Sequence, residues 1–298
     1  MRAVWDLESW QPSYSFLNFL VGAEMERIKH GDQYLDLVIN PSTNGYYNKY
    51  KFWPRTVEEA DQCMDMIVKP MISMLPSVRN VEWPRVRRII MPTDYYLPRF
   101  TTAPFTAAYA LGIRPLHWSP MEGVVDTAKL VTMTWRECGS EHWEARDTDV
   151  NAWTNAAHKL QSFGYDVRIV RDTRKANEKL PDLNTMPVAS RYLHQRASLY
   201  MAAACNLFVS NGPAWFALAL DAPVIMFRPS CNEAAPSASD DYLGYVGIRR
   251  GEQLAGAVPH QRLVWDDDTA DNIVRECKRF MNARNRISGG GRLVGTAG

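Results

Sequence analysis

The chain has 298 residues, of which 46% are apolar and 22% are charged, so its composition is that of a folded globular protein and excludes a disordered one. Its 34 basic and 33 acidic residues nearly cancel, which disfavours bulk binding to nucleic acid. No apolar run reaches the ~20 residues that span a bilayer and the first residues lack the apolar region of a secretion signal, so we expect no membrane span and a cytoplasmic location.

The first half of the chain alternates predicted strands with predicted helices. Short apolar runs predict three strands, at residues 3–6, 34–40 and 87–92. Amphipathic spacing predicts one helix at residues 13–30 and another after the capping box of Thr56 and Glu59.

The second half repeats the alternation more densely. Strands are predicted at residues 129–135, 165–170, 206–210, 222–227 and 262–265. Helices are predicted from the cap at Asp149 to Gly164, and at residues 194–204, 214–220 and 269–284. Strands that alternate with helices favour crossover units and parallel sheets.

The periodicity lapses around residues 115–128, which contain proline, glycine and acidic residues typical of a connection. We therefore predict the α/β class, with two Rossmann-like domains whose parallel sheets face a cleft. The predicted N-terminal domain covers residues 1–125. The predicted C-terminal domain covers residues 126–287, and residues 288–298 form a flexible tail.

Neither the cysteines nor the acidic residues have the spacing of a metal site. The five cysteines are far apart and odd in number, which predicts buried thiols without a disulfide framework or a zinc site. The acidic run at residues 266–268 directly precedes the predicted helix at residue 269, where negative charge favours a helix start.

A sharp turn follows the predicted strand at residues 206–210. Its residues are Ser210, Asn211, Gly212, Pro213 and Ala214. Glycine permits the turn and proline fits the first helical position, so backbone N–H groups at the helix start would bind a phosphate or diphosphate. The alternative interpretation is an ordinary capped crossover without a ligand.

The run SNGPAWFALALDAPVIMF resembles the loop, helix and strand of bacterial heptosyltransferases and related enzymes of the glycosyltransferase-B fold. In those enzymes a glycine-proline turn precedes a helix of small residues and a strand that begins with Pro-Val. The resemblance implies that residues 126–287 are a Rossmann-like domain that binds the nucleotide-sugar donor and that residues 1–125 bind the acceptor. It also implies that residues 210–214 bind the diphosphate of a nucleotide sugar.

A second resemblance lies at VTMTWRECGSEHW, which is similar to the first strand of the donor domain in fucosyltransferase-like members of this fold. There the strand ends in an arginine that holds the diphosphate, and Arg136 stands at the matching position. A guanidinium can bind phosphate oxygens bidentately and stabilise a departing nucleotide diphosphate. The alternative interpretation is a surface ion pair between Arg136 and Glu137, which we also place on the donor side.

Two further residues follow a predicted strand on the donor side, Arg171 and Asp172. Arg196, near the start of a predicted helix, is a weaker candidate there. A surface role is the alternative for each of these residues.

The catalytic base is expected at the end of the first strand. Transfer to a hydroxyl requires a group that accepts its proton, and Asp6 and Glu8 are the carboxylates placed there. Heptosyltransferases have a glycine-aspartate turn at this position, whereas this chain has DLESWQPSYS. An equally good interpretation of Asp6 is a loop carboxylate that accepts backbone N–H groups or pairs with Arg2.

The resemblance implies a glycosyltransferase that moves a sugar from a nucleotide-diphosphate sugar to a hydroxyl acceptor without a metal or other cofactor. One alternative is a nucleotide-sugar epimerase of the same fold, and another is a protein that only binds a nucleotide sugar. The sugar, the nucleotide, the acceptor, the stereochemical outcome and the oligomeric state stay open, because a fold does not determine a substrate.

Overall fold

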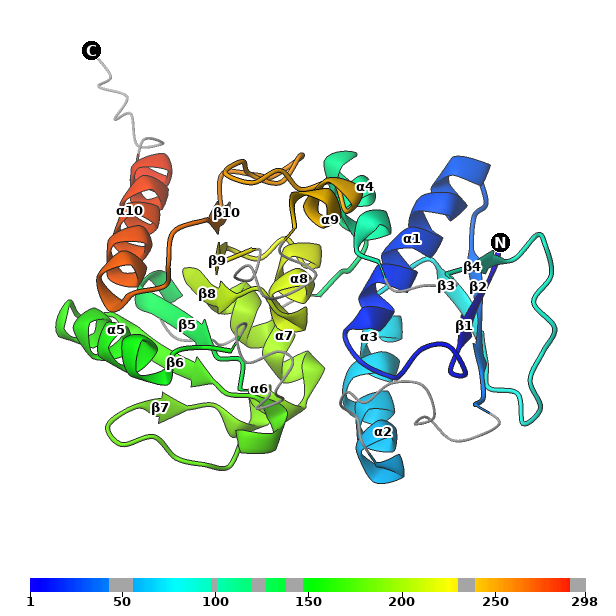
Figure 1. Ribbon diagram of the computed structural model, residues 1–298, viewed down its shortest axis with the longest axis horizontal. Helices are drawn as coiled ribbons and strands as arrows, with labels where there is room; N and C mark the ends of the chain where they lie inside the picture. The colour runs from blue at the N-terminus through cyan, green and yellow to red at the C-terminus, as the bar shows by residue number, and fades with distance from the viewer. Residues whose placement is uncertain (43–55, 98–100, 119–126, 138–146, 230–238, 290–298) are drawn as a thin grey trace, which may run out of the picture.

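The computed structural model describes residues 1–42, 56–97, 101–118, 127–137, 147–229 and 239–289, with side chains up to residue 284. Two parallel sheets lie side by side, and helices pack between them (Figure 1). This arrangement confirms the predicted α/β class with two parallel sheets. Among the described residues, no helix is long and apolar enough to cross a membrane.

The first sheet has the strand order β3-β2-β1-β4. Its strands are β1 (Arg2–Asp6), β2 (Leu35–Asn40), β3 (Val78–Glu82) and β4 (Tyr95–Tyr96). The prediction of a strand at residues 87–92 is wrong, since that run has no regular structure and is largely exposed. The third strand instead pairs with β2 at residues 78–82, where the mixed sequence VRNVE suits the edge of a sheet.

The two faces of the first sheet are covered differently. Helices α1 (Ser15–His30), α3 (Lys69–Ser73) and α4 (Ala103–Ala110) lie on the side toward the second sheet (Figure 1). On that inner face Trp5 packs against Phe16 and Phe19, with ring centroids 5.1 Å apart in each pair. Successive residues of a strand point to opposite faces, so Asp6 points to the outer face.

An extended segment, residues 83–94, crosses the outer face. The Asp6 carboxylate pairs with Arg87, and the Asn40 amide pairs with the backbone N–H and C=O of Arg88, both at 2.9 Å. In the described part of the chain no helix packs on this face (Figure 1). The outer face is therefore covered by extended chain instead of a crossover helix.

Helix α1 ends at Gly31, which has φ 71°, a left-handed conformation that glycine adopts without strain. The predicted cap of the next helix is confirmed, because the Thr56 side chain accepts a hydrogen bond from Glu59 N–H at 3.2 Å. That helix is α2 (Val57–Cys63), and it continues through a π-helical turn, η1 (Met64–Val68), into α3.

The π-helical turn has a local cause. Pro70 lacks the N–H of a regular helix, and its ring crowds the carbonyl four residues earlier. Just before it, the Lys69 N–H bonds to the Met64 carbonyl, five residues back. The wider turn therefore lets the helix pass the proline without a break.

The second sheet has the strand order β10-β9-β8-β5-β6-β7. Its strands are β5 (Leu130–Thr134), β6 (Asp166–Val170), β7 (Asn184–Thr185), β8 (Cys205–Val209), β9 (Val224–Phe227) and β10 (Gln261–Val264). Its helices are α5 (Val150–Ser162), α6 (Pro187–Arg191), α7 (Leu193–Ala202), α8 (Gly212–Ala219), α9 (Asp240–Tyr245) and α10 (Ala270–Gly289). Short 3₁₀ turns are η2 (Thr127–Lys129) and η4 (Thr173–Lys175).

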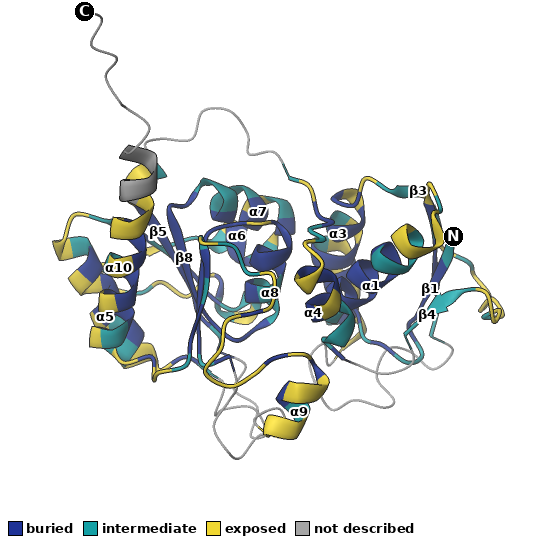
Figure 2. Cartoon of the chain, turned by 90° about the horizontal axis from the view of Figure 1, so that it is seen from above, coloured by how far each residue is buried: buried dark blue, intermediate teal, exposed yellow. Residues whose placement is uncertain are grey.

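Helices cover both faces of the second sheet. On one face Leu207 belongs to a core with residues of α5 and α10. On the other face Phe208 packs against Tyr200 of α7, with ring centroids 5.1 Å apart. This second core continues across to α1 and the first sheet, so the helices between the two sheets are deeply buried (Figure 2).

The cysteines, the end of the last helix and the C-terminal tail can be compared with the predictions. Cys63, Cys205 and Cys277 are free and buried as expected, whereas Cys138 and Cys231 lie outside the described residues. Helix α10 extends to Gly289, past the predicted end at residue 284, and residues 290–298 of the predicted tail also lie outside the description.

Candidate functional site: a cavity between the two halves

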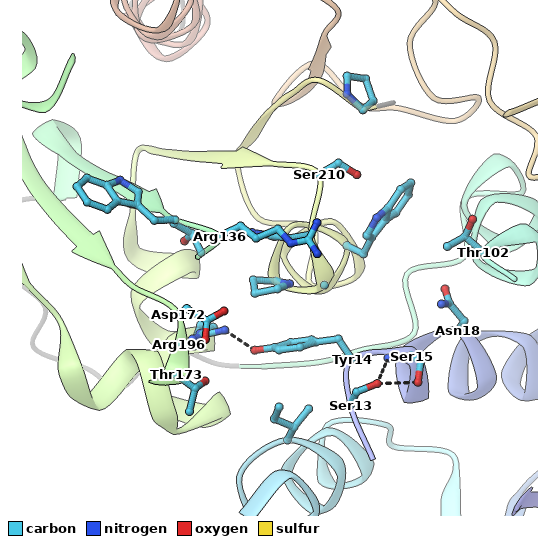
Figure 3. Close-up of a pocket in the computed structure, with 18 of the residues that line it drawn as sticks. Ser13, Tyr14, Ser15, Asn18, Thr102, Arg136, Asp172, Thr173, Arg196 and Ser210 are labelled. Atoms are coloured by element: carbon cyan, nitrogen blue, oxygen red, sulfur yellow. Dashed lines mark hydrogen bonds between the residues drawn. The ribbon is translucent and has the colours of Figure 1, made fainter. Parts of the chain in front are cut away.

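A cavity of about 340 Å³ lies between the two halves of the chain (Figure 3). From the first half it is lined by Ser13, Tyr14, Ser15, Asn18, Ile67 and Thr102. From the second half its polar lining comes from Thr134, Arg136, Arg171, Asp172, Thr173, Arg196, Ser210, Asn211 and Tyr242. Gly212, Pro213 and several apolar side chains complete it.

The cavity lies at the carboxyl ends of neighbouring strands in the second sheet. Arg136 follows β5, Asp172 follows β6 and Gly212 follows β8, and all three line the cavity. In the strand order the chain leaves β5 toward β6 on one side and returns to β8 on the other. The cavity therefore lies at a topological switch point, where open parallel sheets bind ligands.

The turn before α8 is capped by its own side chain. The Asn211 Oδ1 accepts a hydrogen bond from Ala214 N–H at 2.9 Å, and Pro213 has no N–H to offer. The expectation that Ala214 offers a free N–H to a ligand is therefore wrong, and Ala214 does not line the cavity. Ser210, Asn211, Gly212 and Pro213 do line it, as the sequence predicts.

Gly212 is a point of close approach between the halves. A Cβ added there would lie within 2.6 Å of the Tyr14 Cγ, well inside contact distance. Tyr14 comes from the loop before α1, so only glycine lets the first half pack on the turn at β8.

Arg136 is held at the cavity by a fixed backbone. Its N–H donates to the Thr148 Oγ1 at 2.9 Å, and its C=O accepts from the Thr148 N–H at 2.9 Å. The Nε of Arg136 lies 3.5 Å from the Asp147 carboxylate. Its ion-pair partner is therefore Asp147, not Glu137, and Arg136 lies opposite the residues of the first half (Figure 3).

Arg171 and Glu137 pair with each other beside the cavity. Both side chains are buried, and Arg171 donates to the two carboxylate oxygens at 2.9 and 2.5 Å. These hydrogen bonds raise the pKa of Arg171, which stays charged. Arg171 lines the cavity, but Glu137 does not. The guanidinium is already occupied, so the pair positions the strand ends.

Arg196 links the two halves at the floor of the cavity. It donates to the Ala189 and Ser190 carbonyls at 2.8 and 2.7 Å and to the Tyr14 hydroxyl at 2.5 Å. Burial raises the pKa of Tyr14, against the opposing effect of Arg196, so the phenol keeps its proton. The apolar spacing of its helix gives no sign of this contact.

Asp172 is the only carboxylate among the described residues that line the cavity. Its Oδ1 accepts from Arg174 N–H at 3.2 Å, while desolvation by burial raises its pKa. A carboxylate with a raised pKa is a stronger proton acceptor when it is ionised.

The structure does not bring Asp6 or Glu8 to the cavity. Asp6 is fully buried on the outer face of the first sheet, where it accepts from Glu8 N–H at 3.3 Å and pairs with Arg87. Glu8 accepts from the Ser42 hydroxyl at 3.1 Å. The sequence signal for the outward orientation of Asp6 was Trp5, because an aromatic residue that points to the inner face makes the next residue of the strand point to the outer face.

Two polar residues of the first-half wall were not predicted from the sequence, Asn18 and Thr102. Asn18 lies on α1 and is buried, and within the described chain its Oδ1 has no hydrogen-bond partner. Thr102 lies at the start of α4 near Asn18 (Figure 3). A polar residue inside a helix pattern is an ordinary surface signal, so only the fold places these two on a cavity.

No group of three or more His, Cys, Asp or Glu side chains that could hold a metal occurs among the described residues. Within the acidic run, Asp268 pairs with Arg228 at 2.6 Å and accepts from the Trp153 indole at 2.6 Å. Asp266 pairs with Arg275 of α10 at 3.2 Å. Both carboxylates thus connect the start of α10 to its surroundings.

Neither a protein-family model nor a curated protein matches the sequence. Among solved structures, the chain is similar to a glycosyl transferase of family 9 from Veillonella parvula. The identity is 10%, the match covers 95% of this chain and 97% of that chain, and the TM-score is 0.54. This full-length likeness confirms the predicted fold, the two-sheet arrangement of glycosyltransferases of the B type.

Two Escherichia coli structures show weaker similarity. Heptosyltransferase WaaC with ADP is 11% identical, with 95% of this chain and 99% of that chain covered and a TM-score of 0.46. The dodecameric iron-containing glycosyltransferase TibC is 16% identical, with a TM-score of 0.45. The match to TibC covers 76% of this chain, which spans only 57% of the length of that protein.

Proposed function

We propose that this protein is a glycosyltransferase that moves a sugar from a nucleotide-diphosphate sugar to a hydroxyl acceptor. The observation that carries the proposal is the position of Arg136 and Gly212 on either side of the switch point of the second sheet. A cation and a glycine turn in a cavity between parallel sheets suit a diphosphate. The fold likeness to a family 9 glycosyl transferase supports the same class.

Arg136 would stabilise the departing nucleotide diphosphate. Negative charge grows on the leaving group as the bond to the sugar breaks, and a fixed guanidinium stabilises it without reorganisation. The two backbone hydrogen bonds to Thr148 keep the arginine at the strand end before the ligand arrives. In this proposal the protein cation does the work for which other enzymes use a metal, and no further cofactor takes part.

Asp172 is the proposed proton acceptor for the attacking hydroxyl, in place of Asp6 and Glu8. It lines the cavity, and its pKa is raised by burial. The ionised form is the active base, so we expect the transfer rate to fall as the pH drops through this raised pKa. Asp172→Asn should abolish the pH dependence together with most of the activity.

The first-half wall would hold the uncharged part of the reactants. Its described lining residues are hydroxyl, amide or apolar groups, and the buried Asn18 Oδ1 can accept from a sugar or acceptor hydroxyl. The phosphates would thus face the second half and the hydroxyl groups the first.

Two alternatives make different predictions. An epimerase needs an acid and a base around one sugar carbon, yet Asp172 is the sole carboxylate and no histidine is present among the described lining residues. A protein that only binds a nucleotide sugar would show binding with neither transfer nor hydrolysis. Incubation with the donor alone, followed by product analysis, distinguishes the two.

Thermal unfolding with UDP, GDP, ADP, TDP and CMP, each with and without its sugar, tests the proposal. One diphosphate should raise the Tm of the wild type, because a bound ligand stabilises the native state. Arg136→Ala should lose most of that shift. Arg249→Ala is the control, since its side chain is 80% exposed and does not line the cavity. A wild type that responds to none of these nucleotides would contradict the proposal.

A further inference from the structure

Apolar side chains are exposed on the segment that crosses the outer face of the first sheet. Val86 is 77% and Ile89 79% exposed, and Trp83 and Met91 are nearly half exposed. The segment is seen beside β4, at the far end of the molecule from α10 (Figure 1), and it is exposed in Figure 2. Isolated exposed apolar residues are common, but four within nine residues form a patch that calls for a partner.

The patch is held in place by polar anchors underneath it. Arg87 pairs with the buried Asp6, Asn40 binds the backbone of Arg88, and Arg2 pairs with Asp94 at 3.4 Å. These contacts fix the segment against the sheet, while the side chains of Val86 and Ile89 stay in solvent. The exposure is therefore a feature of the folded state.

Basic residues alternate with these apolar side chains. Arg85, Arg87 and Arg88 are exposed between Trp83 and Met91, and Arg79 of the adjacent β3 is also exposed. Arg87 and Arg79 are paired with Asp6 and Asp36, so in the described chain Arg85 and Arg88 are the exposed arginines of this group without a carboxylate partner. Glu82 is the exposed acidic residue at the edge of the patch.

We propose that this face, residues 83–91, docks on the surface of an anionic lipid bilayer. Tryptophan and aliphatic side chains enter the region between headgroups and acyl chains, and arginines bind the anionic headgroups. The two kinds of side chain lie on one fixed segment, so both interactions can form at once. The contact is a peripheral one, with the sheet lying above the membrane surface.

A second copy of this chain is a poorer partner for the patch. In a two-fold symmetric contact the same surface lies on both subunits, so the arginines of one patch would face those of the other. Like charges brought together in this way oppose association. An anionic bilayer has the opposite charge over its whole surface and can pair with Arg85 and Arg88.

Cosedimentation of the full chain with vesicles tests the proposal. We expect binding to phosphatidylcholine vesicles that contain phosphatidylglycerol and no binding to pure phosphatidylcholine vesicles. Arg85→Ala should weaken binding by about fivefold, the effect of one basic side chain near such a surface. The double variant Val86→Asp/Ile89→Asp should abolish it. Leu111→Asp, at a residue 71% exposed outside the patch, should bind as the wild type does.

Three outcomes would overturn the proposal. In the first, the wild type binds neither kind of vesicle. In the second, the Val86→Asp/Ile89→Asp variant binds as well as the wild type. In the third, the wild type would form a dimer in solution that this double variant abolishes, with no binding to vesicles. Unchanged far-UV circular dichroism and Tm of each variant would exclude loss of folding as the cause of a negative result.

Discussion

The two sheets of this molecule share parallel pairing but differ in what covers them. The second sheet lies between α5 and α10 on one face and α7 and α8 on the other, so its strands alternate between two cores. In the described chain the first sheet has helices on one face and an extended segment on the other. When helices cover both faces of a sheet, polar groups gather at the strand ends. A face that no helix covers can instead contact other molecules.

The same difference appears in the charges around the cavity. Every charged side chain in its described lining, three arginines and one aspartate, belongs to the second half. The first half supplies hydroxyl, amide and apolar groups. The second half thus forms an ionic wall of the cavity and the first half a neutral wall. The variants below compare how much buried charged groups and other contacts contribute to the stability of each half.

The largest expected effect is at the buried ion pair of the second half. Glu137→Ala would leave the Arg171 guanidinium buried with its main partner removed, which costs about 3–5 kcal/mol in the free energy of unfolding. Urea denaturation monitored by tryptophan fluorescence measures it. The control Asp36→Ala removes the exposed pair with Arg79 in the first sheet and should leave the midpoint nearly unchanged. Equal losses in both variants would refute the contrast between the two regions.

The next effect concerns the contact that joins the halves. Tyr14→Phe removes the hydroxyl that accepts from the buried Arg196, so we expect a loss of about 1.5–3 kcal/mol, as for hydrogen bonds to charged groups. If this bond couples the halves, calorimetry of the variant should show a broader unfolding transition that separates into two. A narrow transition at the wild-type Tm would show that the halves are joined by other contacts.

A smaller effect is expected where Tyr14 passes over the turn before α8. Gly212→Ala forces a methyl group against the tyrosine ring, and overpacking of this kind costs about 1–3 kcal/mol. The same substitution at Gly244 in α9, where an added Cβ meets nothing within 4 Å, is the matched control. Thermal denaturation of both variants should show destabilisation at position 212 alone.

The smallest effect is expected at a helix start in the first half. Thr56→Ala removes the side chain that caps α2 and should cost about 1 kcal/mol. Thr56→Ser keeps the oxygen and serves as the control, with most of the stability retained. A loss that exceeds the one from Glu137→Ala would contradict this order of effects.

Much of the fold could be predicted from the sequence, because local signals and packing agree in most elements. The helix before Gly31 and the helix capped at Asp149 were both expected where they occur, and Asp149 accepts from Asn151 N–H at 3.0 Å. The run at residues 87–92 is an exception, because it was predicted as a strand and has no regular structure. Its apolar residues suit a buried strand, but they are exposed on the outer face, and pairing with β2 selected the less apolar residues 78–82.

The candidate site was predictable where its residues directly follow strands. Arg136, Asp172 and Gly212 all satisfy that rule and line the cavity. Asp6 also follows a strand, but its face is determined by the packing of Trp5 and not by its position in the sequence. The place of Asn18 in the neutral wall was not predicted, because Asn18 faces the cavity only once the two halves have packed together.

The π-helical turn before Pro70 also determines what the helix that contains it can tolerate in evolution. A π-helical turn holds one residue more than an α-helical turn, so deletion of one residue within Met64–Val68 would close it to an α-helical turn, in which the Pro70 ring crowds the carbonyl four residues earlier. Insertion of one residue would instead rotate α2 by about 100° relative to α3, which would expose the buried Cys63 and break the 3.0 Å contact of Glu59 with Arg174. Substitutions in this helix can therefore accumulate one at a time, whereas its length can change only together with the proline.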